Sequence, residues 1–290
     1  MKKQKKKGMS LARRHALFGL LFLLPWIIGL FCFTIFPILY SFWMSICKID
    51  FEVSGMRSTF VGMQWYKMIF TEDASFLPDI LDTLRFIVFS TPMILVMAVI
   101  LGLLLNQAVK GRGFFRALFF FPVIVVSGPV MNKLMSNQAT AIIQPEKFAV
   151  YQVVATLPDI ISVPLLYLFD NIVLILWYSG VQILIILSGL QKISGNIYEA
   201  AAIDGASKWQ SFWKITIPFL KPMILVCGVY TVMDLAFFSN NRISQLINYH
   251  LVRIDAPYSY SAALSWLYTL AVLLILLVVY GILKERRKER

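Results

Sequence analysis

Long apolar runs separated by short polar stretches dominate this sequence. A membrane crossing by an α-helix needs about 20 consecutive, mostly apolar residues. Six runs reach this length or come close to it: residues 16–46, 86–109, 117–134, 172–190, 215–238 and 262–283. The pattern therefore predicts an all-α, polytopic membrane protein with six transmembrane helices. No strand-like alternation suggests a membrane β-barrel.

Prolines complicate two parts of this pattern. Pro25 and Pro37 predict either a kink in the first helix or an extension of it beyond the membrane. Residues 148–169 are apolar enough to form a seventh crossing, but they contain Pro158, Asp159 and Pro164. Seven crossings would place the two ends of the chain on opposite sides of the membrane.

The distribution of charge decides between six and seven crossings. With six crossings and an internal N-terminus, 19 of the 27 Lys and Arg residues but only 4 of the 15 Asp and Glu residues lie inside. This follows the positive-inside rule, whereas seven crossings would put one basic terminus outside. We therefore predict that residues 1–15 form a cytoplasmic basic tail and residues 16–290 a single transmembrane domain. Both termini are then cytoplasmic, and residues 148–169 form an interfacial or re-entrant outer segment.

Composition excludes several other classes of protein. The chain is 59% hydrophobic and only 14% charged, with a mean hydropathy of +0.75, which is typical of a polytopic membrane protein. Three Cys and two scattered His residues predict neither a disulfide framework nor a metal site. The net charge of +12 comes from basic clusters beside membrane helices, so it does not indicate nucleic-acid binding. The first apolar run is too long for a signal peptide, so it is predicted to be retained.

A polar loop, residues 192–218, lies between two of the apolar runs. Asn196 and Glu199 predict a variant capping box for a helix that begins at Ile197. This helix carries three small residues, Ala200 to Ala202, which allow another surface to approach closely, and Gly205 can end it in a left-handed conformation. A second helix would then present an aromatic stripe of Trp209, Phe212 and Trp213. The alternative is an amphipathic helix lying on lipid headgroups.

The spacing of residues within this loop resembles the EAA loop of bacterial ABC-import permeases. The matching positions are Glu199-Ala200-Ala201, Gly205, Ile215 and Ile217-Pro218, with Ile217 standing where Leu is usual. The rest of the chain resembles the six-span, sugar-type permeases in four short elements, which begin at Phe60, Gly111, Leu187 and Tyr260. It departs from them at residues 131–152 and 237–250, both on the predicted outer side, and this leaves the exact sugar open.

The resemblance implies one permease subunit of an importer in a bacterial cell membrane. A second permease, two cytosolic ATPase subunits and an extracellular solute-binding protein would be its partners. The ATPase subunits would bind ATP and Mg, because this chain has no phosphate-binding loop of the P-loop type. The chain itself is therefore expected to be no enzyme and to bind no cofactor. The positions expected to couple it to the ATPase are Glu199, Ala200, Ala201, Asp204, Gly205 and Ala206.

Polar and aromatic residues within the predicted spans are the candidates for substrate contacts, since polar groups in a membrane tend to face a cavity. Tyr230, Asp234 and Phe237 share one face of the fifth span, where a carboxylate and rings suit a sugar. Further candidates are Gln182, Trp177, Tyr178 and Asn132. Asp234 can instead be an interfacial helix-end residue, and Trp177 and Tyr178 can belong to an aromatic belt.

Three functions remain open at this point. The first is import of an oligo- or polysaccharide, with glycerol phosphate or another small polar solute as a variant. The second is a secondary transporter or channel, and the third is a membrane scaffold without transport activity.

Overall fold

The computed structural model describes residues 11–52, 55–107, 113, 147–237, 241–252 and 258–284 of the 290-residue chain. It is mainly helical and divides into two compact units. The N-terminal unit comprises Met1–Glu72 and Tyr249–Trp266, and the bundle unit comprises Asp73–Asn248 and Leu267–Arg290. The third predicted crossing, residues 117–134, lies outside the described residues.

The first apolar run of the N-terminal unit is helical throughout. It consists of α1 (Leu11–Leu30), a π-helical turn η1 (Phe31–Ile35) and α2 (Phe36–Ser45). The ring of Pro37 crowds the carbonyl group four residues earlier, which belongs to Phe33 in η1, and a π-helical turn is one way to accommodate this. The irregularity predicted from the prolines is therefore found beside Pro37, while Pro25 lies inside α1.

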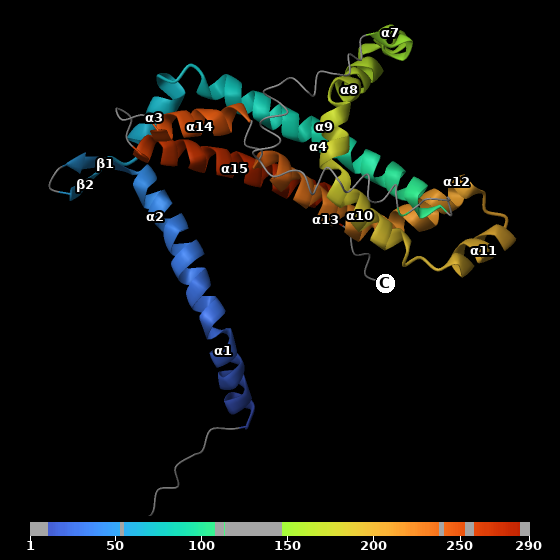
Figure 1. Ribbon diagram of the computed structural model, residues 1–290, viewed down its shortest axis with the longest axis horizontal. Helices are drawn as coiled ribbons and strands as arrows, with labels where there is room; N and C mark the ends of the chain where they lie inside the picture. The colour runs from blue at the N-terminus through green and yellow to red at the C-terminus, as the bar shows by residue number, and fades with distance from the viewer. Residues whose placement is uncertain are drawn as a thin grey trace, which may run out of the picture. The chain divides into compact units, whose positions relative to one another are not determined.

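A β-hairpin follows α2 and was not predicted. Strands β1 (Cys47–Glu52) and β2 (Gly55–Phe60) pair in antiparallel register (Figure 1). The N–H of Ile49 donates to Ser259 Oγ at 3.2 Å, and Trp65 Nε1 of α3 (Gln64–Thr71) donates to the carbonyl oxygen of Cys47 at 3.0 Å. Cys47 and Ile49 are buried. The purely helical prediction is wrong for this short segment.

Five segments build the core of the bundle unit: α4 (Phe76–Asn106), α9 (Ile172–Tyr178), α10 (Gly180–Leu190), α13 (Ile217–Ala236) and the part of α15 (Tyr258–Leu283) after residue 266. One hydrophobic core includes residues 98–105 of α4, 183–190 of α10 and 220–227 of α13. A second core includes residues 87–94 of α4, 175–178 of α9, 232–236 of α13 and Val272 of α15.

The two cores fix the directions of these helices. From the second core to the first, residue numbers rise along α4 and along α9 and α10, but they fall along α13. A Cβ atom at Gly228 of α13 would lie 2.7 Å from Leu283 Cδ1, so α15 also reaches the level of the first core at its C-terminal end. Helices α4, α9–α10 and α15 therefore run in one direction, and α13 runs in the opposite direction.

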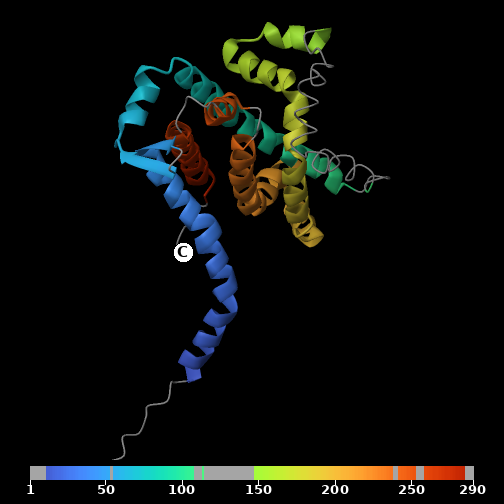
Figure 2. The same ribbon diagram turned by 60° about the vertical axis from the view of Figure 1, so that its left-hand side comes forward.

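Several helices have the length and composition of membrane crossings. Within the described ranges there are four: Phe18–Ser45, Phe76–Asn106, Lys208–Ala236 and Tyr258–Leu283. The fourth predicted crossing, residues 172–190, forms α9 and α10, which are separated only at Ser179. The ambiguous segment 148–169 forms two short helices, α7 (Ala149–Ala155) and α8 (Asp159–Asp170), at one end of α9 (Figure 2). Neither is long enough to cross a membrane by itself.

The predicted outer stretch 237–250 contains the start of α14 (Arg242–Val252). Arg242 Nη1 lies 2.8 Å from Asp82 Oδ2 on α4, in an exposed ion pair. The side-chain amide of Asn241 donates to the carbonyl oxygen of Leu235 at 2.8 Å. These two bonds tie the segment after α13 to the bundle unit.

Candidate functional sites

The polar loop contains a helix, α11 (Gly195–Ile203), whose N-terminal cap differs from the prediction. Ser194 is the N-cap, with extended backbone angles, and the helix begins at Gly195 rather than Ile197. Asn196 lies inside the first turn, and no side chain caps this end. The predicted capping box of Asn196 and Glu199 is therefore wrong, because Ser194 turns the chain into the helix two residues earlier.

Gly205 ends α11 as predicted. Its φ angle is +80°, in the left-handed region that favours glycine. The N–H of Gly205 donates to the carbonyl oxygen of Ala202 at 3.1 Å, and the N–H of Ala206 donates to that of Ala201 at 2.9 Å. This pair of bonds is a Schellman motif, which satisfies two carbonyl groups at the helix end.

A second short helix, α12 (Lys208–Ser211), follows the turn and has a complete capping box. The N–H of Gln210 donates to Ser207 Oγ at 3.2 Å, while the N–H of Ser207 donates to Gln210 Oε1 at 2.9 Å. The Ser-x-x-Gln spacing is a recognised signal for such a box, and the sequence analysis did not use it. Both sides of the Gly205 turn therefore have fixed backbone geometry.

The predicted aromatic stripe forms a cluster of three rings. The ring centroids of Phe212 and Trp213 are 5.0 Å apart, and those of Trp209 and Trp213 are 5.6 Å apart. The cluster spans α12 and the π-helical turn η4 (Phe212–Thr216), which leads directly into α13. Trp209 is nevertheless 69% exposed.

One side chain joins α11 to the base of α13. The hydroxyl groups of Tyr198 and Thr216 are 2.8 Å apart, and Thr216 is buried. The ring of Tyr198 also packs against the first hydrophobic core. Sequence analysis did not identify Tyr198 or Thr216 as functional, since an isolated Tyr and Thr eighteen residues apart carry no pattern that predicts their contact.

The rest of α11 is exposed. It contains no buried residue, and Ile203 at its C-terminal end is 87% exposed. Glu199 and Asp204 are exposed too, and the side-chain carboxylate of neither residue forms a hydrogen bond or ion pair with any residue that the structure describes. A helix that combines small residues with an exposed Ile and a free carboxylate is suited to binding another protein.

A second candidate site lies near the other end of α13, where the structure brings three predicted residues together. On α13, Asp234 lies one turn after Tyr230, and its neighbours Val232 and Leu235 pack with Tyr178 of α9 in the second hydrophobic core. Asp234 is half-buried, Tyr178 is buried and Tyr230 is partly exposed. Phe237, one turn further on, is 77% exposed. This part of α9 and α13 offers one carboxylate and two phenol groups.

The remaining predicted contacts lie elsewhere. Gln182 is fully buried, and its Nε2 donates to Thr231 Oγ1 at 2.8 Å, linking α10 to α13. Gln182 Oε1 and Trp177 Nε1 are buried without a hydrogen-bond partner among the described residues. Asn132 lies outside the described residues. Substrate binding by any of these residues stays a prediction.

Comparison with known proteins places the chain in a family. It is 32% identical over 228 residues to a probable ABC transporter permease protein, YesP, of Bacillus subtilis (strain 168), covering 76% of this chain and 70% of the relative. It is 28% identical to the lactose transport system permease protein LacF of Rhizobium radiobacter, covering 96% and 98% of the two chains. The trehalose/maltose transport system permease protein MalF of Thermococcus litoralis is 26% identical over 78% of this chain and 75% of its own length.

The fold has a relative among solved structures. A crystal structure of a bacterial ABC transporter that imports the acidic polysaccharide alginate matches with a TM-score of 0.65 and 21% identity, covering 96% of this chain and 98% of that one. No family model matches the sequence. The chain is thus an ABC transporter permease, and within that class it belongs to the sugar-type permease family.

Proposed function

We propose that this chain is one permease subunit of an ATP-driven importer that carries a carbohydrate across a bacterial cell membrane. Its partners would be a second permease, two cytosolic ATPase subunits that bind ATP and Mg, and an extracellular binding protein that delivers the sugar. The names of its relatives support the cargo class, since they include lactose and trehalose/maltose permeases. The fold relative, an alginate transporter, was also solved with a periplasmic protein that holds an alginate pentasaccharide.

The observation that carries this proposal is that α13 connects both candidate sites. The α11–α12 loop is held at the start of α13 by the Tyr198–Thr216 bond. Tyr230 and Asp234 lie on the same helix, and the 14 residues from Ile217 to Tyr230 correspond to about 20 Å of helix. A movement of the loop would therefore be transmitted along one continuous helix to the residues that face the sugar.

The exposed α11 would be the surface that enters a groove on one ATPase subunit. Closure of the ATPase pair on ATP would pull α11, and the bond to Thr216 together with the Gly205 turn would pass this displacement to α13. Ala200 and Ala201 would allow close contact, and Glu199 and Asp204 would pair with basic groups or backbone amides of the ATPase. In this mechanism the permease hydrolyses nothing and only changes conformation.

The cluster around Asp234 would bind the sugar. A carboxylate within a membrane-spanning helix is tolerated when it is paired, hydrated or faces a cavity. Sugar hydroxyl groups can donate to the carboxylate, while the ring of Tyr230 packs against an apolar sugar face. Tyr178 would contribute its hydroxyl group from α9. Sugar binding would therefore depend on the relative positions of α9 and α13.

The helix directions in the bundle unit support six crossings, while the cytoplasmic location of both termini rests on the distribution of charge along the sequence. Because α4 and α9 run in the same direction, the chain between them must cross the membrane an odd number of times. If residues 117–134 cross, then α7 and α8 do not, which favours six crossings over seven.

In labelling of intact cells, cysteines placed at positions 3 and 288 should be protected and one at position 250 should react. Reaction at either terminus would contradict this topology.

Cross-linking tests the role of α11 directly. A photoreactive group attached at Ile203→Cys, after replacement of Cys32, Cys47 and Cys227, should form an adduct with the ATPase subunit. The matched control is Phe60→Cys on β2, another highly exposed apolar site, which should form none. Equal yields of ATPase adduct at both positions, or none at Ile203, would contradict the docking of α11.

A further inference from the structure

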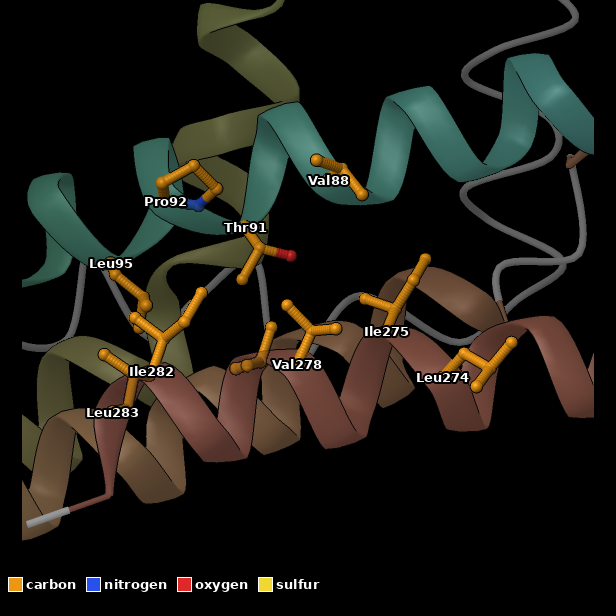
Figure 3. Close-up of a pocket in the computed structure, with 10 residues that line it drawn as sticks. Val88, Thr91, Pro92, Leu95, Leu274, Ile275, Val278, Ile282 and Leu283 are labelled. Atoms are coloured by element: carbon orange, nitrogen blue, oxygen red, sulfur yellow. The ribbon is translucent and has the colours of Figure 1, made fainter.

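An apolar groove of about 410 Å³ lies between α4 and α15 within the bundle unit. Side chains of Val88, Thr91 and Leu95 face those of Leu274, Val278 and Leu283 across it (Figure 3). Among the described residues that line it, Thr91 is the only polar one, and its hydroxyl group donates to the carbonyl oxygen of Ile87 at 2.7 Å. The described lining can therefore recognise hydrocarbon and offers no free polar group.

The length of the groove matches one leaflet of a bilayer. On α15 the lining runs from Leu274 to Leu283, which corresponds to about 14 Å of helix. The hydrocarbon core of a membrane is about 30 Å thick, so this is close to half of it. A transmembrane helix of another subunit would pack along the whole thickness, whereas a lipid acyl chain occupies a single leaflet.

Positive charge follows at the end of the groove. Lys284 comes directly after the lining residue Leu283, is exposed, and places its Nζ 5.4 Å from the ring centroid of Tyr280. Residues 284–290 contain five Lys and Arg residues and two Glu residues. Basic clusters that directly follow a transmembrane helix attract anionic lipids, with about 1 kcal/mol for each basic residue near the surface.

We propose that this groove binds one acyl chain of an anionic phospholipid, whose phosphate group pairs with Lys284 at the membrane surface. The two halves of the site have different roles. The α4–α15 groove supplies apolar contact area, and Lys284, directly after the end of α15, selects the charge of the headgroup. A bound chain would fill the space between α4 and α15 and hold these two helices at a fixed separation. The site is separate from α11 and from the Asp234 cluster, so it does not depend on the identity of the sugar.

Photo-labelling of the full transporter in nanodiscs tests the proposal. The probe is phosphatidylglycerol that carries a photoreactive diazirine in one acyl chain, in a phosphatidylcholine background, and mass spectrometry locates the adducts. We expect adducts on groove residues of α4 and α15. Val278→Phe, which fills the groove, should abolish them. The control Leu277→Phe adds the same ring to an exposed neighbour outside the lining and should not.

Competition with unlabelled lipids tests the role of the charge. Unlabelled phosphatidylglycerol should displace the probe better than phosphatidylcholine, and Lys284→Gln should reduce this preference about fivefold. Lys221→Gln, at an exposed site on α13, should leave the preference unchanged. Three results would each overturn the proposal. The two lipids could displace the probe equally, or Val278→Phe could leave the adducts unchanged in a transporter with normal subunit composition. The groove could also form an adduct with another subunit.

Discussion

Substitutions at Gly205 can distinguish two possible roles of this residue: it can allow the left-handed backbone turn, or it can leave room for a partner protein. Gly205 has a φ angle of +80°, and a Cβ atom built there would meet nothing within 4 Å. A Cβ atom at this position therefore clashes with nothing, and the left-handed backbone conformation is what opposes a side chain there. The variants Gly205→Val, Gly205→Ala and Gly205→Asn should then differ according to their tolerance of that conformation.

The size of the effect follows from this geometry. A non-glycine residue in the left-handed region costs about 1–2 kcal/mol, and the cost is highest for a β-branched side chain. This corresponds to a decrease of about 5- to 30-fold in the population of the correctly formed turn. Asn visits this region routinely, so Gly205→Asn should retain most of the native turn. The transmembrane helices lie outside the turn and should stay folded in all three variants.

The assay is ATPase activity stimulated by the binding protein, together with co-purification of the ATPase subunits. Gly205→Val should lose both most strongly, Gly205→Ala less, and Gly205→Asn least. If Asn is as harmful as Val, then the added bulk blocks the ATPase groove and the backbone is not the cause. Normal activity and assembly for Gly205→Val would refute the need for this turn in coupling.

Three further predictions concern the link between α11 and α13, the residues around Asp234, and the packing of α4 against α10. Tyr198→Phe and Thr216→Val should each weaken the link between α11 and α13 by about 1 kcal/mol, and the double variant should be no worse than either single one. A lower ratio of sugar transported to ATP hydrolysed would detect this loss, and additive effects would contradict a direct bond. Asp234→Ala and Tyr230→Ala should reduce sugar uptake while assembly and basal ATPase activity stay near normal. Full uptake by Asp234→Asn and Asp234→Ser would instead favour an interfacial helix-end residue. Gly102→Ala would place a Cβ atom 2.8 Å from Ile186 Cγ2 and should destabilise the α4–α10 contact by about 1–3 kcal/mol; Gly29→Ala, with no atom within 4 Å, is the control in thermal unfolding.

Hydropathy located most helices but not all of their ends. The second crossing was predicted to begin at residue 86, whereas α4 begins at Phe76. The first turns of α4 carry charged residues, namely Asp79, Asp82 and Arg85. They limit the apolar run but they do not limit the helix, because charged residues on the first turns can remain outside the hydrocarbon. The start of α11 was also misplaced: its N-cap position is Ser194, two residues before the predicted one.

The β-hairpin shows a different limit of sequence reasoning. Residues 47–52 alternate between apolar and polar side chains, which is a strand signal. The run is only six residues long and lies between helical segments. The residues that bury Cys47 and Ile49 come from other parts of the chain. Trp65 and Ser259 bind this strand, and neither contact follows from local pattern.

The two candidate sites differ in how far the sequence could define them. The Gly205 turn and the aromatic stripe depend on residues close together in the chain, so their spacing was sufficient. The proximity of Tyr178 and Asp234 depends on how α9 packs against α13. The burial of Gln182 and its bond to Thr231 depend on the packing of α10 against the same helix. Such contacts between helices are set by the whole core and not by one segment.

Reconstitution in liposomes tests the central claim, that this chain imports a sugar only as one part of an ABC transporter. The purified chain should carry out no transport by itself or with ATP alone. Uptake should appear when the second permease, the two ATPase subunits and the sugar-loaded binding protein are present, and Glu199→Lys should strongly reduce it. Substrate-driven transport by the single chain would contradict the account, and so would unchanged uptake by the complete complex that carries Glu199→Lys.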